Sequence, residues 1–149
     1  MDRTRRETLR AGGLLALLLA AGLVRPGEAL AQDAFAVKTL KDALQALGAG
    51  TPAGSDAILI KAPEIAENGA VVPVAIESKL PGTQAIALLI EKNPQPLAAS
   101  FNIPGGTEAN VSTRVKMGET SDVYALVKAD GKFYLAKKEI KITLGGCGG

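Results

Sequence analysis

The sequence predicts an all-β domain: an immunoglobulin-like antiparallel β-sandwich of about seven strands with a short N-terminal amphipathic helix. Two observations carry this prediction. After residue 55, short runs rich in Val, Ile and Leu are separated by turn residues about every 8–12 positions, which is typical of two-sheet sandwiches. Within several runs apolar and polar residues alternate, so each strand has one face for a core. At 149 residues the chain has room for one such domain.

The helix is predicted from Val37, where Val37, Leu40, Leu44 and Leu47 share one helical face and Gly48 provides a stop signal. Packing of this face against the domain is favoured over a partner-binding role.

The candidate strands share β-branched composition and flanking turn residues; they are residues 57–62, 71–77, 85–91, 98–103, 110–116, 122–128 and 132–144. Pro73 lacks a backbone donor, which predicts an edge strand or a bulge. The pair Asp130-Gly131 predicts a hairpin, because both residue types tolerate positive φ. The core is expected to rest on aliphatic residues together with five aromatics, which are Phe35, Phe101, Tyr124, Phe133 and Tyr134.

Residues 1–31 have the three-part build of an export signal: a basic start, an apolar run from Leu14 to Val24, and a small-residue ending at Ala31. A membrane anchor is the alternative, but the run falls well short of the roughly 20 apolar residues that cross a bilayer. The pair Arg5-Arg6 favours twin-arginine (Tat) export over the Sec route. We therefore expect a periplasmic protein, cleaved after Ala31, with no membrane segment in its mature form.

Composition excludes several classes of function. Beyond the predicted signal, the chain has 12 basic and 12 acidic residues. Its net charge there is therefore zero, and the excess of positive charge that binds nucleic acid is missing. The chain has no His, which removes the usual general base and the commonest metal ligand. No metal or other cofactor is expected.

The only thiol is Cys147, which stands between Gly145, Gly146, Gly148 and Gly149 at the carboxy terminus. A lone Cys in an exported chain is a reactive thiol, an intermolecular link or a buried group. Glycine neighbours make burial improbable and predict a thin, flexible arm, about 10 Å long from Leu144 to Cys147. The nearest cations, Lys137, Lys138 and Lys141, are expected to be solvated strand charges.

A catalytic thiol needs a fixed geometry and an activating base, which this arm lacks. Holding a covalent intermediate requires only a tether, so the sequence predicts a carrier and not an enzyme. Two alternatives stay open. Cys147 could form an intermolecular disulfide in an interaction module, or it could serve a thiol peroxidase or thiotransferase, which would turn over alone.

The ending, residues 138–149, resembles that of SoxY, the sulfur-carrier family of bacterial thiosulfate oxidation. The resemblance extends to residues 93–98 (Asn-Pro-Gln-Pro-Leu-Ala), 112–117 and 130–134. It implies a domain at 32–144 that carries a swinging arm at 145–149, with thiosulfate or persulfide adducts on Cys147.

The same resemblance implies a set of partners. A SoxZ-like subunit would form a heterodimer with this chain, and because no second β domain follows, it is expected to be a separate protein. SoxAX would load thiosulfate onto Cys147, and SoxB would release sulfate by hydrolysis. A SoxCD-type sulfane dehydrogenase would oxidise the remaining sulfur where that enzyme is present.

Overall fold

The structure, a computed structural model, describes residues 33–143 of the chain. A short helical turn at residues 33–36 leads into one helix and nine strands. Their bounds are α3 (Leu40–Ala46), β1 (Ala53–Gly54), β2 (Ile58–Lys61), β3 (Ile65–Ala66), β4 (Val72–Ser78), β5 (Thr83–Ile90), β6 (Leu97–Asn102), β7 (Asn110–Val115), β8 (Ser121–Ala129) and β9 (Lys132–Ile142).

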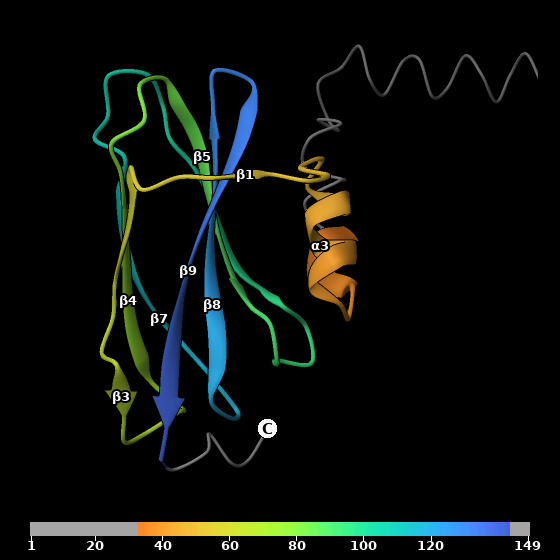
Figure 1. Cartoon of the computed structure of the whole chain (residues 1–149), viewed down its shortest axis with the longest axis vertical. Helices are drawn as coiled ribbons and strands as arrows, with labels where there is room; N and C mark the ends of the chain where they lie inside the picture. The colour runs from red at the N-terminus through yellow and green to blue at the C-terminus, as the bar shows by residue number, and fades with distance from the viewer. Residues whose placement is uncertain (1–32, 144–149) are drawn as a thin grey trace, which may run out of the picture.

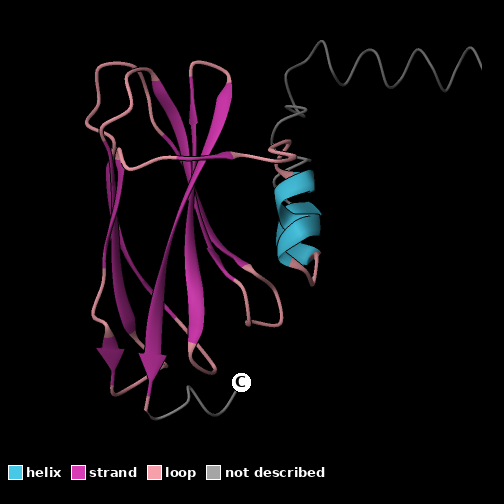
Figure 2. Cartoon of the chain, in the orientation of Figure 1, coloured by secondary structure: helices cyan, strands magenta, loops and turns pink. Residues whose placement is uncertain are grey.

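The strands form two facing sheets (Figures 1 and 2). The larger has the order β1-β9-β8-β5-β6, with β3 paired to β9, and the smaller has the order β2-β4-β7. Pairing is antiparallel except where the two-residue strands β1 and β3 run parallel to β9. The predicted all-β sandwich is confirmed, and all seven predicted strands are present with ends shifted by two residues or fewer.

The core between the sheets is aliphatic. Alternate residues of β8, Val123, Ala125 and Val127, are fully buried, and Ile86 and Leu88 of the neighbouring strand β5 lie beside them in the same cluster. The predicted alternation is thus confirmed, because it places these side chains on the inner face of the sheet.

The expectation that five aromatics join the aliphatic core is confirmed only in part: Tyr134 packs against this cluster, and Tyr124 and Phe133 pack against the cluster under the helix, but none of the five is fully buried. The largest fully buried side chains are aliphatic residues together with Met117 and Pro96. Phe35 is 39% exposed, and Phe101, Tyr124, Phe133 and Tyr134 are only partly buried.

Helix α3 covers the outer face of the larger sheet (Figure 1). Its N-cap is Thr39, whose hydroxyl accepts a hydrogen bond from the Asp42 amide at 3.1 Å. The helix is shorter than the sequence predicts, since Val37 precedes the cap. It ends where expected, because Gly48 adopts φ +77°. The apolar face packs on the domain, through Ala43 and a cluster that includes Leu89 and Leu126.

Pro73 does not mark an edge strand, contrary to the prediction. Strand β4 is the middle strand of the smaller sheet. The reason that Pro73 is tolerated is local: the β2–β4 register ends at Lys61 opposite Ala75, so at Pro73 only β7 lies alongside. Because no strand lies on the β2 side of Pro73, its lack of an amide proton breaks no hydrogen bond there.

The predicted hairpin at Asp130-Gly131 joins β8 to β9, and both residues have positive φ, 49° and 74°. This is the geometry of a two-residue turn that matches strand twist.

Gly82 lies beside this hairpin, where its carbonyl accepts a hydrogen bond from the Asp130 amide at 3.1 Å. Its φ is +71°, and a Cβ there would collide with the Asp130 carboxylate. We expect Gly82→Ala to destabilise the fold by about 1–3 kcal/mol, measured by urea unfolding. Gly54→Ala is the control, since that site has open space and ordinary φ; equal losses in the two variants would contradict this reasoning.

Within residues 33–143, no helix is long and apolar enough to cross a membrane.

Candidate functional site

The predicted carrier residue Cys147 and its neighbours Gly145, Gly146, Gly148 and Gly149 lie outside the described residues. The structure does describe the place from which this segment departs, which is the end of β9. The candidate site is therefore built from that point.

The end of β9 is clamped on both sides. Strand β8 pairs with it up to Ile140 opposite Ser121, and β3 pairs with its last two residues. The Thr143 amide donates to the Ala66 carbonyl at 3.2 Å, and the Lys141 amide donates to the Glu64 carbonyl at 2.9 Å. The last described residue is thus held by a backbone hydrogen bond.

A side chain completes the clamp. The Thr120 hydroxyl accepts a hydrogen bond from the Ile142 amide at 2.9 Å, and Ile140 is fully buried in the core. Residues 144–149 therefore begin at a fixed point on the sandwich.

We call the surroundings of this point the arm-end face; it consists of residues 64–71, 91–96, 116–122 and 139–143. Its loops are tied together by hydrogen bonds. Asn93 Nδ2 donates to the Lys116 carbonyl at 2.7 Å, and the Met117 amide donates to the Gly69 carbonyl at 2.7 Å. Two of the segments on which the family resemblance rests, 93–98 and 112–117, meet in the first of these bonds.

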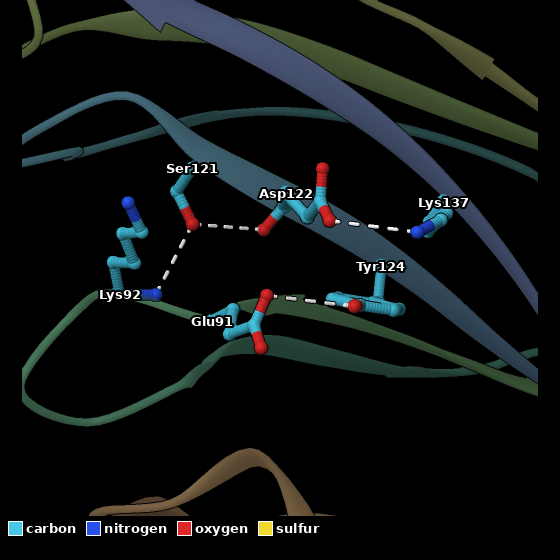
Figure 3. A network of polar contacts seen from close by, with 6 residues as sticks. All are labelled: Glu91, Lys92, Ser121, Asp122, Tyr124 and Lys137. Carbon is cyan, nitrogen blue, oxygen red and sulfur yellow. Dashed lines mark hydrogen bonds and ion pairs between the residues drawn. The ribbon is translucent and has the colours of Figure 1, made fainter.

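A polar network extends from this face along β8 (Figure 3). The Ser121 side chain is 3% exposed. Its hydroxyl accepts from the Lys92 amide at 3.1 Å and donates to the Asp122 carbonyl at 3.0 Å. This buried hydroxyl fixes the β5–β6 loop against the start of β8, because a buried polar group is costly to leave unpaired.

Tyr124 and Glu91 form the outer part of the network. The Tyr124 hydroxyl donates to Glu91 Oε2 at 3.5 Å (Figure 3). Partial burial raises the pKa of Tyr124 above its ordinary 10.0, and the Glu91 and Asp122 carboxylates and the hydrogen bond to Glu91 raise it further.

This shift predicts a pH dependence. A phenol whose pKa is higher in the folded state contributes stability that is present below pH 10 and is lost as the pH rises through the folded pKa. In a Tyr134→Phe background, absorbance titration of Tyr124 should give a midpoint above 10.0. Adding Glu91→Gln should lower that midpoint, since it removes the carboxylate charge. A midpoint at or below 10.0 before that change would contradict the assignment.

The lysines near the end of β9 differ from one another. Lys137 pairs with Asp122 at 3.6 Å and stays largely exposed, as expected for a solvated strand charge. Lys138 Nζ instead donates to the Ala62 carbonyl at 2.7 Å, which ties β9 to the segment before β3. Lys141 is exposed.

Outside the arm-end face the described residues form a cavity but no cluster of metal ligands. Among residues 33–143, no three His, Cys, Asp or Glu side chains group as metal ligands would. A cavity of about 360 Å³ lies between α3 and the larger sheet, lined by Ala85, Lys128 and Phe133 among others. Lys128 pairs with Phe133 beside the Asp130-Gly131 hairpin, so this cavity lies at the end opposite to the arm-end face.

The sequence did not predict β3, although β3 holds the end of β9 in place. Residues 62–69 read as a loop, since two residues cannot show a period and Pro63 and Gly69 are turn signals. Pairing with β9, a tertiary effect, makes them a strand.

Comparison with known proteins shows a strong similarity to the SoxY family. The sequence profile of the SoxY family, described as sulfur oxidation protein SoxY, matches residues 43–147. The solved structure of the sulfur carrier protein SoxY from Chlorobium limicola f thiosulfatophilum is 40% identical, with a TM-score of 0.64, and the match covers 73% of this chain and 96% of that one.

A more distant similarity concerns the fold alone. Superoxide reductase (neelaredoxin) from Ignicoccus hospitalis is 22% identical with a TM-score of 0.51, and the match covers 57% of this chain and 79% of that chain. No curated protein sequence matches the chain.

Proposed function

Because the chain belongs to the SoxY family of sulfur oxidation proteins, we propose that it holds thiosulfate-derived sulfur on Cys147 and presents it to the enzymes of the Sox system. Its family makes the chain a sulfur carrier and not a catalyst. The observation that supports Cys147 as the attachment point is the extent of the family match, which runs to residue 147 itself.

The proposed chemistry has two kinds of step. In loading, the Cys147 thiol and thiosulfate form a sulfur–sulfur bond, the thiol proton is released, and two electrons pass to the haem enzyme SoxAX. In hydrolysis, SoxB directs water to the terminal sulfone sulfur, which leaves as sulfate, while a persulfide stays on Cys147. A SoxCD-type enzyme then oxidises the outer persulfide sulfur to a sulfonate, with three oxygen atoms taken from water and six electrons passed to that enzyme. A second hydrolysis by SoxB releases this group as sulfate and restores the thiol.

The described structure supports a passive role for the arm. The chain is anchored up to Thr143 by β3 and Thr120, so the proposed arm, Gly145–Gly149, would move from a fixed pivot. A short tether keeps the intermediate at a high effective concentration near its carrier. We propose a SoxZ-like subunit as the stable partner in a heterodimer.

We further propose that residues 1–31 are a cleaved export signal, of the Tat type because of its Arg5-Arg6 pair. Export would place the carrier domain, 32–144, in the periplasm. An oxidising compartment suits a carrier whose single thiol has no partner within the chain.

The test is loading of the purified chain. Incubation with thiosulfate and SoxAX should add the mass of one thiosulfate to the terminal peptide that contains Cys147, whereas thiosulfate alone should add nothing. Turnover of thiosulfate by the isolated chain, or loading at another residue, would overturn the proposal.

A further inference from the structure

Three large hydrophobic side chains are exposed among the described residues, and two of them lie on the arm-end face. Ile65 is 58% exposed and Val71 is 53% exposed, while the third, Phe35, belongs to the amino-terminal segment. Single exposed hydrophobics need no explanation, but two of them beside the starting point of residues 144–149 call for one.

Both side chains are held in place by the backbone. Ile65 belongs to β3, and it is paired with Lys141 at the end of β9. The loop that carries Val71 is closed by Asn68, whose side chain accepts from the Ala70 amide at 2.9 Å and whose carbonyl accepts from the Val71 amide at 3.4 Å. The adjacent residue Val72 is fully buried, so Val71 cannot turn inward with it.

The length of the chain beyond Thr143 limits where a partner must sit. Cys147 is four residues further on, which allows a reach of at most about 14 Å. Any protein that acts on this thiol must therefore bring its surface close to the arm-end face. If the thiol enters a recessed active site, part of the chain between Thr143 and Cys147 lies inside the partner. The two protein surfaces would then be in contact.

The composition of this part of the face suits such a contact. Exposed charges of both signs, Glu64, Glu67 and Lys141, are close to Ile65 and Val71 in the sequence or in strand register. An apolar centre with a polar rim is the usual anatomy of a protein interface, and the apolar anchors contribute most of the binding energy.

We propose that Ile65 and Val71 are the anchors on which an enzyme that processes the Cys147 adduct docks, by an apolar rim around the entrance to its active site. The inference rests on the proposed function of Cys147. It assigns recognition by the enzyme to the folded domain. The enzyme would bind the arm-end face, and the arm would bring the sulfur into the active site.

The experiment separates docking from chemistry by loading the thiol without an enzyme. Tetrathionate reacts with a thiolate by exchange: the Cys147 sulfur bonds to one inner sulfur, and thiosulfate leaves, so no other oxidant is needed. This small anion needs no docking surface. The loading rate should therefore be the same for the wild-type chain, for Ile65→Ser, and for the double variant Ile65→Ser/Val71→Ser.

The loaded proteins, each in complex with the SoxZ-like subunit, are then given to SoxB, and sulfate release is followed. We expect kcat/KM to fall about tenfold or more in the double variant and less in Ile65→Ser, mainly through KM, since lost apolar contact weakens binding. Phe35→Ser, the same kind of change outside the arm-end face, should leave kcat/KM within about twofold. Melting temperatures check that all variants fold.

An unchanged kcat/KM in the double variant would overturn the inference while leaving the proposed function intact. The inference would also be overturned if the double variant changed the chain's sedimentation or its binding of the SoxZ-like subunit, because the patch would then belong to those interfaces. If loaded wild-type protein released no sulfate, the proposed function itself would fail, and the inference with it.

Discussion

We expect Cys147→Ser to abolish thiosulfate oxidation in a reconstituted Sox system and to leave the fold unchanged. A hydroxyl at this position cannot form the sulfur–sulfur bond on which every later step depends, and the chain has no other thiol. The clusters that stabilise the described sandwich are built from residues 34–142, so thermal unfolding should match that of the wild type. Sulfate formation from thiosulfate is the measurement.

A relocated thiol provides the control. Ser112 is exposed on β7, and Cys147→Ser/Ser112→Cys restores one thiol to a rigid strand. Tetrathionate should load this thiol, but the double variant should remain inactive, because the sulfur cannot enter a recessed site. Thiosulfate oxidation by either variant would contradict the role of Cys147 on its arm.

The largest expected effect on stability is that of Ile86→Ala. Ile86 is fully buried in the cluster between the two sheets, in register with Val127 of β8 and Phe101 of β6. Removing its side chain loses apolar burial and leaves a cavity, which costs about 2–5 kcal/mol. Urea unfolding followed by circular dichroism should show this loss as a lower midpoint.

Ile65→Ala is the matched control, since the same atoms are removed from a side chain that is 58% exposed. Its effect should stay within about 0.5 kcal/mol. If both variants lost similar stability, the assignment of the core to the space between the sheets would be wrong.

The strands were predictable because their signals are local. Val123, Ala125 and Val127 alternate with polar or outward-facing residues. The pair Asp130-Gly131 favours a two-residue turn between antiparallel strands, and both residues have positive φ. The position of Pro73 in a middle strand was not predictable, because a proline is tolerated there only where β2 has already ended. A single sequence shows that a proline lacks a donor but does not show which neighbouring strand is absent at that residue.

The candidate site likewise has one part that the sequence indicates and one part that only the tertiary structure shows. The thiol and its glycines are adjacent in the sequence, so a chemistry for them can be proposed without a fold. The anchoring of the end of β9 was not predictable, because it depends on Ala66 and Thr120, which meet this strand only through tertiary contacts. The exposure of Ile65 was equally hidden, since an Ile in a short apolar segment is more often buried.

The central claim, that Cys147 carries thiosulfate-derived sulfur, is tested most directly by mass spectrometry of the protein isolated from cells grown on thiosulfate. The terminal peptide should contain thiosulfate and sulfane-sulfur adducts on Cys147, and they should disappear on treatment with a reducing thiol. A peptide found only as a disulfide-linked dimer, with no such adduct, would contradict the claim.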